Sequence, residues 1–338
     1  MKTNHVFLFI MIALFLSSVL HAQSQEDLAA VKIKDQWGFI DHSGKMVINP
    51  QFRGANPFGD GLAPVKAGDN WGYVDAKGKW VIQPHYNQAE PFNDGIARVI
   101  LNQPGTVKWI FINREGKQAI AEQYDNCMEF NEGLAAARIG KTWGFIDKTG
   151  HFIIENKYEH AETFHEGNAS VKIRNTWGFI NKKGEWNWQT DYENIRDMYE
   201  GIAPVKSKKG WGYAEHTGKL IVPPIHENAL PFSEKRAAAK HKGLWGYYDL
   251  TGVLVIPFAY TDCQDFSEGL AAVKKGKFWG FVDKTGNMVI APEFEKVRDF
   301  QHGMAAVKAH GRWGFIDKTG KMIIQPQYDD VLSFTFVK

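Results

Sequence analysis

Residues 304–328 read MAAVKAHGRWGFIDKTGKMIIQPQY, and this pattern returns along almost the whole chain. One Trp marks each copy, and successive markers lie 34 residues apart except for a step of 38 before Trp109. The markers are Trp37, Trp71, Trp109, Trp143, Trp177, Trp211, Trp245, Trp279 and Trp313. Because a fixed period of this length is the signature of a tandem-repeat protein, we count nine units rather than the two domains that 338 residues would otherwise suggest.

Further columns of residues keep the same register as the tryptophans. Gly follows the marker in every unit but one, where Ile110 replaces it, and a second Gly comes seven residues after every marker. Phe comes twenty-one residues after the marker, with Met198 as the single replacement. The unit reads L-A-x-V-K-x4-W-G-F-I-D-x2-G-K-x-V-I-x-P-x-Y-x5-F-x-E-G, and departures from it stand out clearly.

Three short strands fit inside each unit: LAxVK, WGFID, and the apolar run that ends near the Pro and Tyr. The Asp-Lys-Thr-Gly segment between the second and third strands is typical of a tight turn, in which Gly adopts a positive φ. The segment between the first and second strands absorbs the insertion of the third unit (101–108), as expected of a surface turn. No helix is expected.

The apolar pattern predicts how the units pack. A half-exposed strand alternates apolar and polar residues, but WGFI is apolar on both sides. Each small sheet is therefore expected to be covered on both faces by its neighbours. A column of Ala fits this close approach of sheets: Ala63, Ala97, Ala135, Ala169, Ala203, Ala237, Ala271 and Ala305. One three-stranded unit buries too little apolar area to be stable alone, whereas a series of units buries enough.

In its W-G-F-I-D, G-K, apolar-run and P-x-Y order, the unit resembles the WG repeat, also called the KWG repeat, of bacterial proteins. The resemblance covers nearly all of the chain from Leu28 to Phe334. It implies a repeat fold and often a secreted or surface setting, and it implies no catalytic residues. The departures are Ile110 in the third unit, the missing Pro of the third to fifth units, and Lys235 in the sixth unit, where other loops have Gly.

The fold class expected is all-β: a tandem array of three-stranded antiparallel units in an open, curved, solenoid-like stack. The array of repeats starts with LAAVK and ends after the Phe position, so no strand is expected to be shared between its two ends. Nine blades would also exceed the usual number in a propeller. A closed, propeller-like ring is the alternative.

The N-terminus has the layout of a secretory signal. Lys2 provides a positive charge, Val6 to Leu20 is an uncharged apolar run, and Ala22 is a small residue suited to cleavage. We therefore expect a signal peptide over residues 1–22 and a repeat domain over residues 23–338, exported to the periplasm, the cell surface or the exterior. An uncleaved anchor is the alternative, and no membrane span is expected after cleavage.

Charge and cysteine content narrow the function classes. The chain has 40 basic and 38 acidic side chains, and loss of Lys2 with the signal leaves a net charge near +1. This balance gives no reason to expect binding to nucleic acid or anionic membranes. Cys127 and Cys263 occupy the same position in the third and seventh units, too far apart along a stack for a disulfide, so we expect two buried free thiols.

No segment carries a convincing catalytic or metal-binding pattern. Asp147 to Gly150 resembles the phosphorylated motif of ion-pumping ATPases, but its recurrence in three turns indicates turn chemistry. Gly72 to Lys79 has the wrong spacing for a phosphate-binding loop and precedes no helix. His160 and His165 lie five apart without further ligands. We expect no enzyme activity, no cofactor and no metal.

Two charge columns have a structural interpretation and a functional one. The basic column ends the first strand and comprises Lys32, Lys66, Arg138, Lys172, Lys206, Lys240, Lys274 and Lys308. The acidic column precedes that strand and comprises Asp60, Asp94, Glu132, Glu166, Glu200, Glu234 and Glu268. Because the two columns match, we interpret them as solvated sheet edges. A basic ladder for an acidic polymer is the alternative.

The fifth unit has the densest departures from the repeat. Trp186 and Trp188 alternate along its third strand, Trp188 replaces a core Ile or Val, and Tyr192 and Tyr199 lie nearby. Residues two apart on a strand share a face, so an exposed indole could stack on a sugar or fill a partner's pocket. These four residues form the predicted binding surface. An enlarged local core is the alternative.

The function predicted is a non-enzymatic, exported protein-interaction or scaffold module of the bacterial envelope or exterior. A long repeat surface suits an extended partner, which the sequence does not identify. Carbohydrate or glycan binding is the alternative function.

Overall fold

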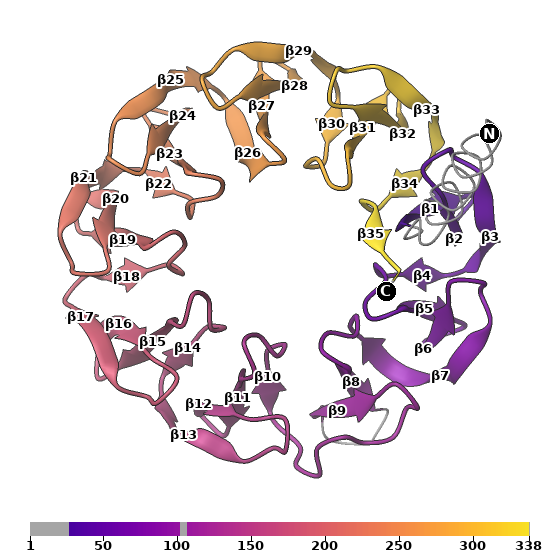
Figure 1. The fold of residues 1–338 in the computed structure, drawn as a ribbon, viewed down its shortest axis with the longest axis horizontal. Coiled ribbons are helices and arrows are strands. Elements are labelled where there is room, and N and C mark those ends of the chain that lie inside the picture. The colour runs from indigo at the N-terminus through magenta and orange to yellow at the C-terminus, as the bar shows by residue number, and fades with distance from the viewer. Residues whose placement is uncertain (1–26, 102–106, 338) are drawn as a thin grey trace, which may run out of the picture.

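The computed structural model describes residues 27–101 and 107–337, which form β-strands and turns without a helix. The sheets are arranged in a ring around a central axis (Figure 1). The all-β prediction is therefore confirmed. The predicted signal peptide lies outside the described residues, and the described part of the chain has no helix able to cross a membrane.

Eight of the nine repeats contribute all three predicted strands, and the third repeat contributes the first two. The LAxVK strands are β1 (Asp27–Ile33), β5 (Leu62–Ala67), β8 (Ile96–Leu101), β11 (Ala135–Ile139), β15 (Ala169–Ile173), β19 (Ile202–Ser207), β23 (Arg236–His241), β27 (Leu270–Lys275) and β31 (Met304–Ala309). The WGFID strands are β2 (Gln36–Ile40), β6 (Asn70–Asp75), β9 (Trp109–Asn113), β12 (Thr142–Ile146), β16 (Thr176–Ile180), β20 (Gly210–Glu215), β24 (Leu244–Asp249), β28 (Phe278–Asp283) and β32 (Arg312–Asp317). The outermost strands are β3 (Met46–Phe52), β7 (Trp80–Ala89), β13 (Phe152–Tyr158), β17 (Trp186–Thr190), β21 (Leu220–His226), β25 (Leu254–Tyr260), β29 (Met288–Phe294) and β33 (Met322–Tyr328).

A fourth, short strand follows the outermost one and lies nearest the axis (Figure 1). These innermost strands are β4 (Gly54–Ala55), β10 (Asn126–Cys127), β14 (His160–Ala161), β18 (Asn194–Ile195), β22 (Asn228–Ala229), β26 (Asp262–Ser267), β30 (Lys296–Val297) and β34 (Asp330–Val331). Each pairs with the LAxVK strand of the following repeat, as β10 does with β11. Every repeat therefore contributes one strand to the sheet of the following repeat.

The nine repeats make eight hydrogen-bonded sheets over the described residues. β7 runs without a break from the outer rim into the strand that pairs with β8, so β4 to β9 form one six-stranded sheet. The outermost strand of the third repeat is reduced to isolated bridges, Trp109 with Tyr124 and Ile112 with Gln118.

The prediction of an open stack is wrong, because the two ends of the array share a sheet. β34, from the last repeat, pairs with β1, and β35 (Thr335–Phe336) also pairs with β1. The alternative of a closed ring is the correct one. The three-strand unit expected from the sequence lacks the two-residue strand after the Tyr, which is the element that closes the ring.

Both faces of each sheet are buried, as the apolar pattern predicts. Phe39 and Ile40 are adjacent on β2, and both are fully buried. Phe39 packs with Ala63 and Val65 of the following sheet, whereas Ile40 packs with residues of the last repeat. All eight members of the Ala column are at most 2 % exposed, which confirms that neighbouring sheets approach closely there.

The Asp-Lys-Thr-Gly segments form the predicted turns. In the turn at Asp147, the carboxylate accepts hydrogen bonds from the backbone N–H and the hydroxyl of Thr149, and Gly150 has a φ of +89°. In the equivalent turn, hydrogen bonds from Thr285 chiefly lower the pKa of Asp283 to about 2. The aspartates therefore stabilise the turns.

Candidate functional site

The outermost strand of the fifth repeat, β17, ends earlier than its counterparts. In the other described repeats the marker Trp pairs with the residue fifteen positions later, as Trp143 pairs with Tyr158. In the fifth repeat Trp177 pairs instead with Thr190. Tyr192 therefore lies beyond the end of the strand, where the chain turns away from the sheet.

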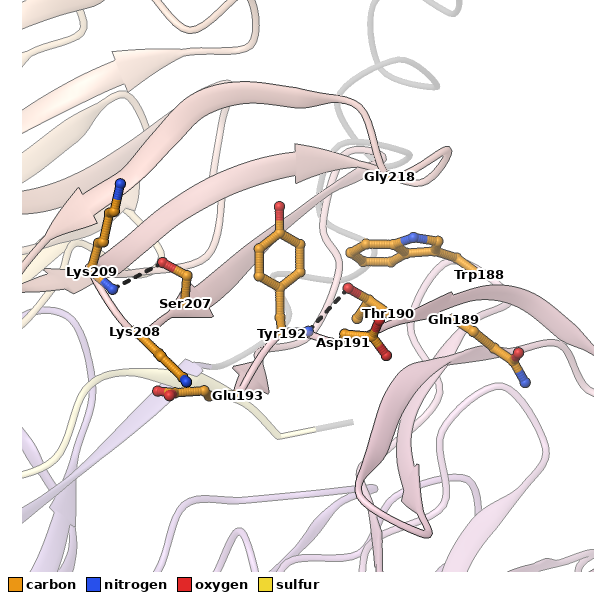
Figure 2. Close-up of a pocket in the computed structure, with 10 residues that line it drawn as sticks. All are labelled: Trp188, Gln189, Thr190, Asp191, Tyr192, Glu193, Ser207, Lys208, Lys209 and Gly218. Carbon is orange, nitrogen blue, oxygen red and sulfur yellow. Dashed lines mark hydrogen bonds between the residues drawn. The ribbon is translucent and has the colours of Figure 1, made fainter.

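A hollow of about 670 Å³ lies where β17 ends. It is lined by residues 188–193, by the turn 207–209 and by Gly218, and we call it the β17 hollow (Figure 2). The ring centres of Trp188 and Tyr192 lie 6.4 Å apart at 64°, and Tyr192 stands between Trp188 and the turn in Figure 2. Partial burial raises the pKa of Tyr192.

Trp188 is held by packing on two sides. Its ring is stacked on Phe179, with ring centres 5.8 Å apart at an interplanar angle of 14°. A Cβ added at Gly218 would lie 2.6 Å from its Nε1 atom, so the next repeat's turn touches the indole directly. Trp188 replaces the core Ile or Val of other repeats, as the sequence indicated, and remains partly accessible from the hollow.

The predicted binding surface does not form one site. A register shift between the Phe179–Trp188 and Ile180–Trp186 pairs puts the two indoles on opposite sides of the sheet. Trp186 packs at right angles to Tyr158 of the preceding repeat, with ring centres 6.4 Å apart. The expectation that the two rings share a face is therefore wrong.

Tyr199 lies apart from the other three predicted residues. Its ring packs against His165, with ring centres 4.8 Å apart, and it lines a separate hollow of about 680 Å³. Of the four predicted residues, only Trp188 and Tyr192 meet.

Exposed charged groups of both signs surround the β17 hollow. Asp191 and Glu193 follow the end of the strand, and Lys208 and Lys209 lie on the facing turn. The N–H of Lys209 donates to the Ser207 hydroxyl at 3.1 Å, which fixes this turn. Two rings edged by carboxylates and ammonium groups form a pocket that suits a side chain with both apolar and polar parts.

The basic column packs against the marker tryptophans. Lys172 Nζ lies 5.6 Å from the ring centre of Trp177, and Lys274 Nζ lies 5.8 Å from that of Trp279. Such ammonium groups cover indole faces and stabilise the sheet edges. This packing favours the structural interpretation of the column over a free basic ladder.

The acidic column links successive repeats by hydrogen bonds and ion pairs. Glu268 has a positive φ of 52°, and its carboxylate accepts the backbone N–H of Gly303 at 3.0 Å. Lys318, from the turn beyond, lies 3.0 Å from the same carboxylate. Equivalent ion pairs join Lys148 to Asp94, Lys182 to Glu132 and Lys284 to Glu234.

Both cysteines are buried, and His160 is paired with a carboxylate. Cys127 and Cys263 are buried free thiols, as predicted, and burial raises the pKa of Cys127 to about 12. His160 Nε2 lies 2.7 Å from a carboxylate oxygen of Glu162. The described residues contain no group of three or more His, Cys, Asp or Glu side chains that could hold a metal ion.

A second hollow was missed by sequence reasoning. It has a volume of about 820 Å³, lies around β30 where the sheet of β26 to β29, the sheet of β30 to β33 and the sheet of β1 and β34 meet, and is lined mainly by polar and charged side chains. We call it the β30 hollow. Its sequence signal is Arg298-Asp299 before the Phe, a dipeptide that otherwise occurs at this position only as Arg196-Asp197.

The closed ring of repeat-built sheets defines a β-propeller. The family model described as "WG containing repeat" matches residues 37–71, 71–103, 109–143, 143–177, 177–210, 211–245, 245–277, 279–313 and 313–335. The chain therefore belongs to the WG-repeat family, with nine repeats, as its sequence resemblance predicted.

Solved structures of low sequence identity share the fold. One, titled as a eukaryotic initiation factor, has a TM-score of 0.68 at 11% identity and covers 92% of this chain and 98% of its own. Another, dihydro-heme d1 dehydrogenase NirN in complex with DHE, has a TM-score of 0.50 at 10% identity and covers 94% of this chain and 76% of its own. At such identities the likeness concerns the fold alone. No curated protein sequence matches the chain.

Proposed function

We propose that this WG-repeat propeller is an exported, non-enzymatic protein-interaction module of the bacterial envelope or exterior, and that it binds an extended segment of a partner protein along β17. Export is supported by the signal-like layout around Lys2, Val6 to Leu20 and Ala22. The binding mode is supported by one observation: β17 lacks the features that protect the other outer edges of the ring.

The other described outermost strands are protected against pairing by proline, by irregular register, or by both. Pro50, Pro84, Pro224, Pro257, Pro292 and Pro326 interrupt six of them. All seven, including the proline-free β13, show two register shifts against their WGFID partner. Proline removes a backbone donor and bulges distort an edge, so both discourage the addition of a strand.

β17 lacks the proline altogether and has only part of the irregular register. It contains no proline, shows a single register shift, and pairs in regular register over Trp177 to Phe179. It pairs only with β16, so its other edge faces outward. An extended peptide binds such an edge by main-chain hydrogen bonds and gains specificity from adjoining side-chain pockets. The β17 hollow, with Trp188 and Tyr192, is such a pocket.

Site-specific photocrosslinking in the producing cells tests the proposal. A photoreactive amino acid at Lys208, beside the β17 hollow, is compared with the same amino acid at Lys242, the equivalent turn position one repeat later. Both positions are exposed, so neither replacement disturbs the core. We expect a discrete protein adduct from position 208 and not from position 242. Equal adducts from both positions, or none from position 208, would contradict it.

A pair of tryptophan variants separates binding from folding. Trp188→Ala removes the ring in the hollow, whereas Trp186→Ala removes a ring of the same strand that packs between sheets. Both variants are expected to lower the melting temperature, but only Trp188→Ala should abolish the adduct from position 208. Loss of the adduct in both variants would show that the rings support the fold alone.

A further inference from the structure

Three residues that line the β30 hollow each have a buried polar atom without a hydrogen-bond partner within the protein. The atoms are Oε1 of Gln264, Nε of Arg298 and Oδ1 of Asp299. Buried polar groups in folded proteins are almost always paired, so three unpaired atoms around one hollow require an explanation. Two of these atoms are acceptors and one is a donor, which suits a ligand that presents hydroxyl groups, since a hydroxyl both donates and accepts.

The charges around the β30 hollow are balanced. Four side chains are basic and four are acidic: Lys274, Lys296, Arg298 and Lys308 against Glu295, Asp299, Asp329 and Asp330. Some are already engaged with each other, as Arg298 lies 3.6 Å from Asp330. A strongly charged ligand would face as many repelling as attracting groups, so the balance favours a neutral one.

Two indoles complete the lining. Trp313 is buried beneath the Arg298 guanidinium, whose Cζ lies 5.5 Å from the ring centre. Trp279 is only half-buried, and Lys274 Nζ lies 5.8 Å from its ring centre. A partly exposed indole beside polar groups suits a ligand with an apolar face and a polar rim. The volume of about 820 Å³ lies within the range of small-ligand sites.

We propose that the β30 hollow binds a neutral oligosaccharide, with the apolar face of one sugar ring against Trp279 and its hydroxyls bonded to Gln264, Arg298 and Asp299. This site goes beyond the proposed partner edge at β17, uses other repeats, and is independent of it. The adduct from position 208 tests only the proposed protein partner at β17. Sugar binding tests only the proposed site in the β30 hollow.

The test uses the full chain without its predicted signal, residues 23–338. Binding to an array of neutral glycans is followed by calorimetric titration with cellotetraose, maltotetraose, chitotetraose and mannotetraose. We expect at least one neutral sugar to bind and to change the tryptophan fluorescence. Absence of binding at concentrations up to ~10 mM, or binding of charged glycans only, would overturn the proposal.

A matched pair of variants locates the sugar. Asp299→Asn alters the hollow, whereas Asp197→Asn alters the same repeat position three units earlier, outside the lining. Asp299→Asn and Trp279→Ala should each weaken sugar binding at least about tenfold, while Asp197→Asn leaves it unchanged. Equal affinity in wild type and Asp299→Asn would overturn the proposal. A melting temperature of Asp299→Asn at or above that of wild type would show that its weaker binding is not a folding defect.

Discussion

Val31 of the first LAxVK strand pairs with Val331, in the last innermost strand, and both side chains are fully buried. The same sheet edge is fixed by the N–H of Leu332, which donates to the carbonyl of Ala30 at 2.8 Å. At the turn of the first repeat, a Cβ added to Gly44 would lie 3.3 Å from Ile324. Gly78 stands in the same relationship to Ile48 of the repeat before it, so the junction between the chain ends repeats the internal junctions.

The marker tryptophans should dominate the stability of the ring. Trp177 is buried, packs with Met198 and Val205, and donates from Nε1 to the carbonyl of Glu193 at 3.0 Å. Trp177→Ala should lower the free energy of unfolding by about 3–5 kcal/mol, as other large core truncations do, measured by urea denaturation. Trp177→Phe, which keeps a ring, should cost less. A loss below about 1 kcal/mol for the Ala variant would show that the column is not core.

The acidic column should make stability depend on acid pH. Burial alone would raise the pKa of Glu268, but hydrogen bonds from Lys318 and Gly303 outweigh it and lower the pKa below its ordinary 4.5. A lowered pKa stabilises the fold above the unfolded value, and this contribution is lost as the pH falls through the folded value. Wild-type melting temperature should therefore fall below about pH 4.5 more steeply than that of Glu268→Gln. The surface control Glu293→Gln should follow wild type, and identical profiles for all three would refute the role of the column.

Ionisation of Asp299 should change the stability of the fold with pH in the sense opposite to that of Glu268. Burial, helped by the nearby charge of Asp265, raises the pKa of Asp299 from 3.8 to about 6. The folded state then binds the proton more tightly than the unfolded state, so stability falls as the pH rises from 3.8 to about 6 and stays reduced above it. Asp299→Asn should be more stable than wild type at pH 7 by about 1–2 kcal/mol, a figure reduced for partial solvation, and equal to it below pH ~4. Thermal unfolding at both pH values measures this, and a less stable variant at pH 7 would contradict it.

The sequence predicted the parts of the fold that repeat locally. The spacing from Trp143 to Gly150 fixes a hairpin through turn geometry, and the apolar pairs such as Phe39 and Ile40 indicate sheets covered on both faces. Ring closure was not predictable in this way, because it depends on a two-residue strand, Asp330–Val331, too short to give an alternating pattern.

The candidate site was predicted only in part, again for a physical reason. Trp188 and Tyr192 were found because they depart from the repeat. Trp186 was placed with them because residues two apart share a face in a regular strand, and a bulge cancels that rule between Trp186 and Trp188. The β30 hollow was missed because its unpaired atoms, such as Oδ1 of Asp299, are a property of the assembled ring.

A disulfide across the junction tests ring closure most directly. Lys32 and Asp330 are paired in register between β1 and β34, and both side chains are partly accessible. Cysteines at these two positions should form an intramolecular disulfide under mild oxidation, since paired strand residues lie within bonding range. The control places cysteines at Lys32 and Lys296, the position equivalent to Asp330 one repeat earlier, and should form none. Faster migration of the oxidised Lys32–Asp330 pair on a non-reducing gel is the predicted result, and its absence, or cross-linked dimers alone, would contradict a closed ring.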